Sequence, residues 1–295
     1  MHPRRAALRG RRKQVVSRKS VASRQVTSQS HVARSKTPGG PHGSPGVFVY
    51  DAARVLLIAA VRSILTFVAV SLYVLIVGPP GMLIAALSGA KRHLYVLGHI
   101  GVKLGLVLSG IRYRVAGREH VHPERAAVYC SNHQSNVDPP ILFDAFHPML
   151  HILYKAELNA IPVLTRAFRY GGFLPVDRRN KEAAMRSIEA GAASIRAGNS
   201  FLIFPEGTRS KTADLLPFKK GGFIMAIQAR APIVPVAVQG GRDSMRKGSW
   251  IIRPVTVSIR IGAPIESAGV TLARRDELIA ETRQRITELL AEGPV

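Results

Sequence analysis

Two apolar stretches stand out in the first third of the chain. Residues 55–77 form an apolar run in which Arg62 is the only charged residue, and residues 94–109 form a second run. The first run is long enough for a membrane helix, which needs about 20 apolar residues. Residues 78–81, which read Gly-Pro-Pro-Gly, predict a break between the two runs. We therefore expect a membrane-associated helical hairpin over residues 51–110, with a pair of buried core helices as the alternative.

From about residue 111 the pattern changes to short strands alternating with amphipathic helices. Strands are predicted over residues 112–116, 126–131, 151–155, 172–176, 200–204, 233–238 and 251–261, and helices over 181–197, 219–230 and 271–291. A further helix is expected to start at Asp138, with the carboxylate as its N-cap and the two following prolines in its first turn. Strands interleaved with helices predict an α/β domain over residues 111–295, with a mostly parallel central sheet flanked by helices.

Residues 1–50 are rich in Arg, Ser, Gly and Pro, and they predict a disordered basic tail. The net charge of the chain is +24, and residues 1–54 hold 12 of the 42 basic residues against one acid. Subtraction leaves 30 basic and 17 acidic residues from residue 55 onward, so the body is basic too. Such a charge suits nucleic acid, anionic lipid or a phosphorylated substrate. The tail is either a basic arm for anionic lipid or an extension without function.

Composition narrows these choices. Aromatic residues make up only 6% of the chain, which is too few for a platform on which single-stranded nucleic acid would stack. Cys130 is the single cysteine, so no intramolecular disulfide can form. It lies in the apolar run Ala-Ala-Val-Tyr-Cys, where a buried strand residue is expected rather than a nucleophile.

The first group of residues with catalytic potential is His133 and Asp138, between a predicted strand and a predicted helix. On a regular helix the two side chains would point about 140° apart, but a turn could bring them together. A carboxylate that holds one imidazole nitrogen leaves the other free to accept a proton. The alternative is that Asp138 only caps a helix and His133 packs in a turn.

The second group is residues 204–210, which read Phe-Pro-Glu-Gly-Thr-Arg-Ser and follow another predicted strand. A turn with glycine, threonine, arginine and serine can direct hydrogen-bond donors at a phosphate. Glu206 is better suited to a hydroxyl group or to an arginine that must be held in place. Taken alone, the segment could also be an ordinary polar turn.

Together with the apolar hairpin, these two groups resemble the glycerolipid acyltransferases of the lysophosphatidate acyltransferase type. His133 and Asp138 match the family's His-x4-Asp motif, and residues 204–210 match its Phe-Pro-Glu-Gly-Thr-Arg-Ser block without a substitution. Further blocks that resemble the family are residues 155–158, 172–178, 218–221 and 233–236. The resemblance covers about residues 95–265 and implies a glycerol-3-phosphate acyltransferase-like fold.

The resemblance also implies roles for individual residues. His133 is the implied general base and Asp138 orients it. The residues implied to bind the acceptor's phosphate are Lys155, Arg178 and Arg209, and those implied to form the rest of the acceptor site are Glu206, Gly207 and Thr208. Neither a metal nor an organic cofactor is expected, and no covalent acyl-enzyme.

The implied reaction moves an acyl chain from acyl-CoA or acyl-carrier protein to the sn-2 hydroxyl of lysophosphatidate, which gives phosphatidate. Anionic substrates and an anionic membrane would account for the basic charge, and no nucleic-acid partner is expected. The basic tail favours the cytoplasmic side, where acyl thioesters occur, so we expect a hairpin that returns or never crosses, at the cytoplasmic face of the cell membrane.

Other functions remain as alternatives. Within the family, the acceptor could be another lysolipid, such as a lyso-ornithine lipid or a lysophospholipid with a head group. Outside it, the basic charge allows a nucleic-acid-binding protein, and His, Asp and Arg together allow a phosphate-ester hydrolase. A hydrolase would normally need a cluster of metal ligands, which the pattern does not supply. The acyl-chain length and the oligomeric state have no signature in the sequence.

Overall fold

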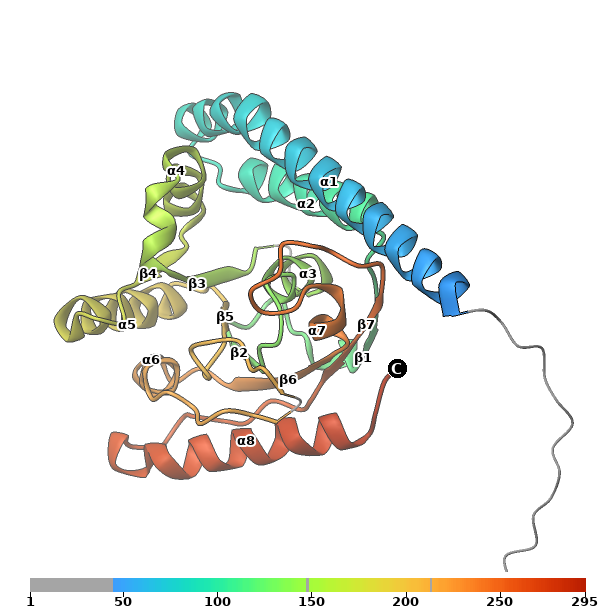
Figure 1. Ribbon diagram of the computed structural model, residues 1–295. Coiled ribbons are helices and arrows are strands. Elements are labelled where there is room, and N and C mark those ends of the chain that lie inside the picture. The colour runs from blue at the N-terminus through green and yellow to red at the C-terminus, as the bar shows by residue number, and fades with distance from the viewer. Residues whose placement is uncertain (1–44, 147–148, 213) are drawn as a thin grey trace, which may run out of the picture. The chain divides into compact units, whose positions relative to one another are not determined.

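The computed structural model describes residues 45–146, 149–212 and 214–295. The predicted tail therefore lies outside the described residues as far as residue 44. The first helix, α1, spans Pro45–Ser88, so it begins before the predicted tail boundary at residue 50. The second helix, α2, spans Arg92–Ser109 and runs back along α1, so the two form a hairpin (Figure 1).

The predicted break at residues 78–81 is wrong, because α1 continues through both prolines and the chain turns at residues 89–91. Tertiary packing outweighs the local preference here. Gly81 lies directly against Leu97 of α2, and Gly78 lies beside Val163 of the domain.

Small residues allow α1 and α2 to approach closely. A Cβ at Gly101 would lie 2.8 Å from the ring of Tyr73, and one at Gly105 would lie 3.3 Å from Val70. The Tyr73 hydroxyl donates a 2.8 Å hydrogen bond to the Leu97 carbonyl. Close contact at small residues is typical of helices that pack in a lipid environment.

Among the described residues, residues 54–88 form one helix that is long and apolar enough to cross a membrane. The mean hydropathy of its most apolar window is 2.4, and only 17% of that window is buried. A core helix of a soluble protein would be mostly buried. This exposure therefore argues against the alternative of buried core helices for α1.

The sheet has seven strands in the order β1-β7-β6-β2-β5-β3-β4. The strands are β1 (Arg112–Ala116), β2 (Val128–Ser131), β3 (His151–Lys155), β4 (Leu174–Val176), β5 (Phe201–Ile203), β6 (Ile233–Gln239) and β7 (Thr256–Ile261). All neighbouring pairs are parallel except β6 and β7. The expectation of a mostly parallel sheet flanked by helices is confirmed, and the carboxyl ends of β2 to β6 meet at one edge.

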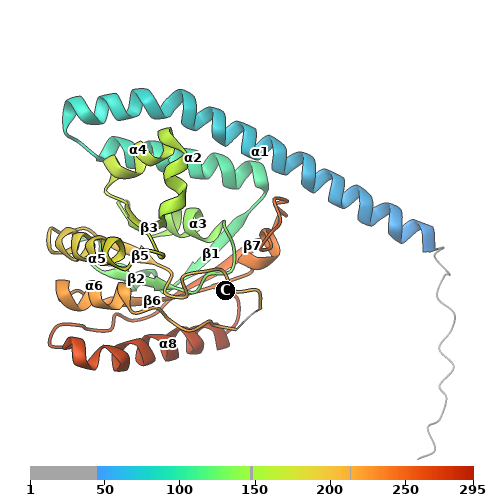
Figure 2. The same ribbon diagram turned by 60° about the vertical axis from the view of Figure 1, so that its left-hand side comes forward.

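Helices cover both faces of this sheet (Figure 2). They are α3 (Asp138–Ala145), α4 (Pro162–Gly171), α5 (Lys181–Arg196), α6 (Gly221–Ala229), α7 (Gly241–Ser244) and α8 (Arg275–Ala291). The hairpin and α3 lie on one side, whereas α6 and α8 lie on the other (Figures 1 and 2). Helices α4 and α7 were not predicted.

Four strands, β2, β4, β5 and β7, are shorter than predicted. Residues 251–255 were assigned to a strand, but β7 starts at Thr256 because Ile252 is buried beneath α1. Gly172 was also assigned to a strand, but it ends α4 in a left-handed conformation with φ 87°.

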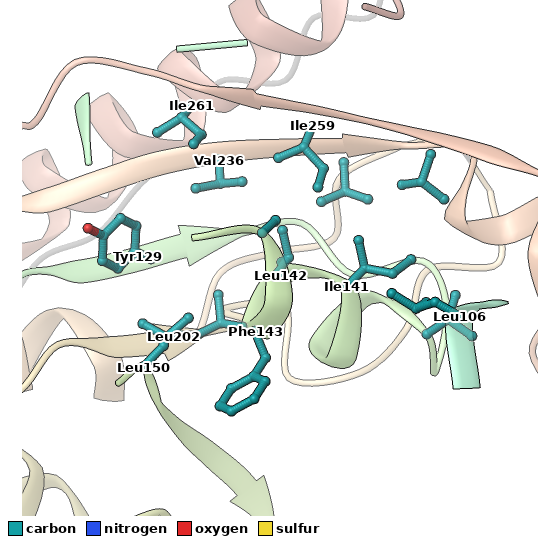
Figure 3. Packing of buried hydrophobic residues seen from close by; sticks show 14 of the residues in the cluster. Leu106, Tyr129, Ile141, Leu142, Phe143, Leu150, Leu202, Val236, Ile259 and Ile261 are labelled. Atoms are coloured by element: carbon teal, nitrogen blue, oxygen red, sulfur yellow. The ribbon is translucent and has the colours of Figure 1, made fainter. Parts of the chain in front are cut away.

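A core of large apolar side chains holds α3 against the sheet (Figure 3). Ile141 and Leu142 of α3 are fully buried, and they face Tyr129 of β2, Leu202 of β5 and Val236 of β6. Burying such side chains contributes about 1.5–3 kcal/mol each. This core fixes the start of α3, and therefore the position of Asp138.

Candidate active site

The predicted site residues lie where strands end at the carboxyl edge of the parallel strands. His133 follows β2, Glu206 follows β5, and Arg178 follows β4. In open α/β sheets, ligands bind in the crevice at this edge.

The turn between β2 and α3 brings His133 and Asp138 together. His133 Nδ1 lies 2.9 Å from Asp138 Oδ2. A carboxylate can only accept, so Nδ1 carries the proton and donates to it, and Nε2 keeps its lone pair. Nε2 has no hydrogen-bond partner among the described residues, and the His133 side chain is 16% exposed. The imidazole also stacks on Phe204, with ring centroids 4.2 Å apart. A substrate proton could therefore reach Nε2.

Asp138 is fully buried, and it does not cap its own helix. Its Oδ2 accepts hydrogen bonds from the backbone N–H groups of Gln134 and Ser135, both at 2.7 Å, as well as from His133. It is the first residue of α3, and the residue before it makes no side-chain cap. The predicted N-cap is thus wrong, because the carboxylate turns back to the tight turn that holds His133.

Gly241, the first residue of α7, packs against the other carboxylate oxygen of Asp138. A Cβ at this position would overlap Asp138 Oδ1. The glycine therefore lets the backbone after β6 close over the buried carboxylate. No pattern in the local sequence links Gly241 with Asp138, since the contact depends on β2 and β6 being neighbours.

Glu206 is buried and holds the His133 turn. Its Oε1 accepts a 2.8 Å hydrogen bond from the His133 backbone N–H, and its Oε2 accepts a 3.0 Å bond from the Leu216 N–H. Burial raises the pKa of the Glu206 carboxyl, although these two N–H groups and the nearby His133 act in the opposite direction. Because both oxygens are engaged, Glu206 acts in this geometry on the backbone of the base rather than as a free ligand.

The turn after β5 presents the candidate phosphate-binding groups. Gly207 has φ 68°, a left-handed conformation that favours glycine, and its carbonyl accepts a hydrogen bond from Arg178 Nη1. Arg209 Nη1 is buried and has no hydrogen-bond partner among the described residues. A buried guanidinium nitrogen without a partner is costly, and an anion bound here would satisfy it.

Lys247 joins this turn, although sequence reasoning did not identify it. Its Nζ donates to Thr208 Oγ1 at 3.0 Å and to the Arg209 carbonyl at 2.9 Å. It belongs to the loop after α7, where one lysine among several basic residues carries no signal in the sequence. Lys155 lies at the end of β3 opposite Val176 of β4, but its Nζ pairs with Glu157 at 3.0 Å. The structure therefore brings Arg178 and Arg209 to the turn directly and leaves Lys155 at the neighbouring strand end.

A cleft of about 760 Å³ opens next to this site on the α8 side of the sheet. It is lined by Gln134, Gln239, Gly240 and Thr287, among others, so it reaches the residue that follows His133. The hairpin lies on the other side of the sheet (Figures 1 and 2). The cleft therefore approaches the His133 turn from the face opposite the hairpin.

Other reactive groups are less suited to chemistry. Cys130 is fully buried in β2, and burial raises the pKa of its thiol. Within the described ranges, no group of three or more His, Cys, Asp or Glu side chains could hold a metal ion. His120 instead hydrogen-bonds to the end of β7, with its Nδ1 2.9 Å from the Ile261 carbonyl.

The site is a His–Asp pair, with the carboxylate buried and the imidazole partly exposed, at the carboxyl edge of the sheet of an α/β domain. Comparisons with known proteins identify the class to which such a domain belongs. Residues 112–239 match the model of the family described as Acyltransferase. Residues 112–239 therefore form a domain of this acyltransferase family.

The names of curated proteins with similar sequences agree with this family. The chain is 33% identical over 183 residues to the 1-acyl-sn-glycerol-3-phosphate acyltransferase of Limnanthes douglasii. This match covers 62% of this chain and 64% of the relative. It is 29% identical over 244 residues to the protein of that name from Pseudomonas aeruginosa, covering 80% of this chain and 92% of the relative. The chain thus spans just under two thirds of the length of the plant relative.

A solved structure shares the fold. The 1-acyl-sn-glycerophosphate (LPA) acyltransferase PlsC from Thermotoga maritima superimposes with a TM-score of 0.69. The match covers 80% of this chain and 97% of that chain, at 23% sequence identity.

Proposed function

We propose that the protein transfers an acyl chain from a thioester donor to the sn-2 hydroxyl of lysophosphatidate, which gives phosphatidate. The observation that carries this proposal is the His133–Asp138 pair, whose free Nε2 lies beside a turn with an unpartnered arginine nitrogen. The relatives named 1-acyl-sn-glycerol-3-phosphate acyltransferase support the choice of acceptor.

In this mechanism His133 Nε2 accepts the proton of the acceptor hydroxyl as its oxygen attacks the thioester carbon. Asp138 holds Nδ1–H and stabilises the imidazolium that forms. When the tetrahedral intermediate collapses, the carbon–sulfur bond breaks and the imidazolium gives its proton to the departing thiolate. An ester and a free thiol result, and the base returns to its neutral form.

The acceptor's phosphate would bind at the turn after β5. Arg209 would supply its unpartnered Nη1, with Arg178 and Lys155 from the adjoining strand ends. Gly207 and Thr208 would line the acceptor site, whereas Glu206 would position His133 through the backbone. An arginine fork suits phosphate because it can donate two parallel hydrogen bonds.

The donor, either acyl-CoA or acyl-carrier protein, would reach the site from the side of the cleft beside Gln134. The lysolipid would come from the hairpin side. Helix α1 exposes large apolar side chains along its length, including Leu57, Leu65, Leu72 and Ile76. We propose that this surface sits in the cell membrane and that the site lies at its cytoplasmic face.

The test is an assay of thiol release with a panel of lysolipids and both donor types, on the unaltered protein and on His133→Ala. We expect lysophosphatidate to be the best acceptor, and the loss of the general base to lower turnover about 10²–10⁴-fold. Preference for a lysolipid without a terminal phosphate would overturn the acceptor assignment. Retention of more than half the activity in a folded His133→Ala protein would overturn the mechanism.

A further inference from the structure

The loop of residues 245–255, between α7 and β7, is bound to helix α1. The Ile252 backbone N–H donates a 2.7 Å hydrogen bond to Ser63 Oγ, and both residues are buried. Figures 1 and 2 show this loop rising from the sheet towards α1. The loop therefore lies where the α/β domain meets the most apolar helix of the chain.

Two arginines belong to this junction, one on α1 and one on the loop. Arg62, next to Ser63, faces the domain, and its Nη1 lies 2.8 Å from the position that a Cβ on Gly110 would occupy. Pro254 Cβ lies 3.2 Å from the same point, so the Arg62 guanidinium lies against the end of the loop. Arg253 precedes this proline, and its Nη1 is buried without a hydrogen-bond partner.

Among residues 45–146, 149–212 and 214–295, no acid pairs with either arginine. Over the described ranges, neither the Arg62 nor the Arg253 guanidinium forms an ion pair or hydrogen bond. A buried guanidinium group without a partner is destabilising, and an anion with several acceptor oxygens would remove that cost. The junction therefore has two arginines without a counter-charge, one of them with a buried nitrogen, and this suits anionic phosphate groups.

The surface around the junction is suited to a membrane. Trp250 is 50% exposed, and Arg246 and Lys247 of the same loop are exposed as well. Tryptophan is enriched at the boundary between lipid and water, and basic side chains near it are attracted to anionic lipid. On α1, the exposed side chains of Val61 and Leu65 flank Arg62 and Ser63.

We propose that Arg62 and Arg253 at this junction bind phosphate groups of anionic membrane phospholipids, with Trp250 at the level of the head groups. This site is separate from the acceptor site, which lies at the turn after β5. Lys247 links the two, because it belongs to the membrane-facing loop and hydrogen-bonds to Thr208 and Arg209. The proposal depends on membrane association and not on the identity of the acyl acceptor.

The chain has one tryptophan, so the fluorescence of the unaltered protein reports on this loop alone. The full chain is incubated with vesicles of phosphatidylcholine and phosphatidylglycerol in which one lipid or the other carries bromine on its acyl chains. We expect a blue shift of Trp250 emission, and quenching several-fold stronger when the bromine is on phosphatidylglycerol. The double variant R62Q/R253Q should bring the ratio of the two quenching effects close to one.

Arg186→Gln is the matched control, because Arg186 is an exposed arginine on α5, away from the loop. It should leave the quenching ratio unchanged, and an equal loss in this variant would overturn the assignment of the site. Trp250 emission that stays at the wavelength of a water-exposed indole would overturn the membrane contact. Inorganic phosphate that removes the preference for phosphatidylglycerol, where chloride at equal ionic strength does not, would identify a soluble anion as the ligand.

Folding of R62Q/R253Q is checked by circular dichroism and by acyl transfer to micellar lysolipid. If the double variant fails to fold, Arg253→Lys replaces it, since this change keeps the charge but removes the fork of donors. We expect Arg253→Lys to lower the quenching ratio partially. An unchanged ratio in a folded Arg253→Lys protein would overturn the role of Arg253.

Discussion

The backbone N–H of His133 donates a 2.8 Å hydrogen bond to Glu206 Oε1, which joins the turn after β2 to the turn after β5. A second bond in the opposite direction, from the Ser210 N–H to the His133 carbonyl at 2.8 Å, completes the connection. The proposed base and the proposed phosphate-binding turn are therefore parts of one hydrogen-bonded unit. A substitution in either turn should therefore alter the geometry of the other.

Asp138→Asn tests whether the charge behind the imidazole matters. Asparagine can still accept the two backbone N–H bonds with its carbonyl oxygen, so the turn should persist. Loss of the negative charge removes stabilisation of the imidazolium and favours the wrong tautomer. We expect a folded protein with turnover lowered at least about 10²-fold. The same change in a serine-protease triad lowers turnover about 10⁴-fold. Near-normal turnover in steady-state assays would contradict the role of Asp138.

Gly241→Ala tests the support behind Asp138 without touching a substrate group. The added Cβ would overlap Asp138 Oδ1, so the carboxylate or α7 must shift. We expect turnover to fall at least about tenfold, since small displacements of a catalytic group are costly, while the Michaelis constants change little. Gly171→Ala is the control, because its Cβ would meet only ordinary contacts at 3.8 Å. Equal effects of the two changes on turnover would contradict this explanation.

Glu206→Gln tests how much the buried carboxylate contributes to the free energy of unfolding. The amide nitrogen must face either the His133 or the Leu216 backbone N–H, so one buried donor loses its acceptor. We expect the free energy of unfolding to fall by about 1–3 kcal/mol, measured in detergent with guanidinium chloride at neutral pH. Turnover should fall as well, because the turn that carries His133 loosens. Unchanged stability would show that neither hydrogen bond contributes.

The pKa of Glu206 adds a prediction about pH. Burial raises this pKa in the folded state, so the folded protein binds the proton more tightly than the unfolded chain does. The stabilisation from this group is complete below the usual glutamate pKa of about 4.3, and it is lost as pH rises through the raised value. Glutamine does not titrate, so the stability of the unaltered protein relative to Glu206→Gln should decrease as pH rises across this interval. A difference that grows with pH would show that the two N–H groups outweigh burial.

Lys247→Met tests the residue that the sequence did not reveal. The change removes the hydrogen bonds to Thr208 and to the Arg209 carbonyl but keeps most of the aliphatic stem. We expect the Michaelis constant for the phosphorylated acceptor to rise about three- to tenfold, in line with a net loss of about 1 kcal/mol, with little change for the donor. Lys211→Met, a change at an exposed lysine that follows the turn after β5, is the control. A rise confined to the donor would place the turn in the donor site instead.

The local sequence pattern was sufficient to predict those elements whose burial is visible in their own residues. The alternation of apolar strands and amphipathic helices predicts the mostly parallel sheet, because each strand of such a sheet is buried on both faces and each helix on one. The same reasoning places Cys130 in a buried strand, and the structure has it fully buried in β2. The motif residues, too, were visible as short polar groups directly after strands.

Only the tertiary structure decided the features that depend on partners distant in the sequence. Helix α1 passes through Pro79 and Pro80 because α2 and α4 pack against the glycines beside them. Asp138 turns away from its helix because the His133 turn offers three donors to one oxygen. Gly241 and Lys247 reach the site only because β6 lies next to β2, and no local pattern encodes which strands become neighbours. Sequence therefore determined which residues are candidates for catalysis, and the strand order determined which residues hold them in place.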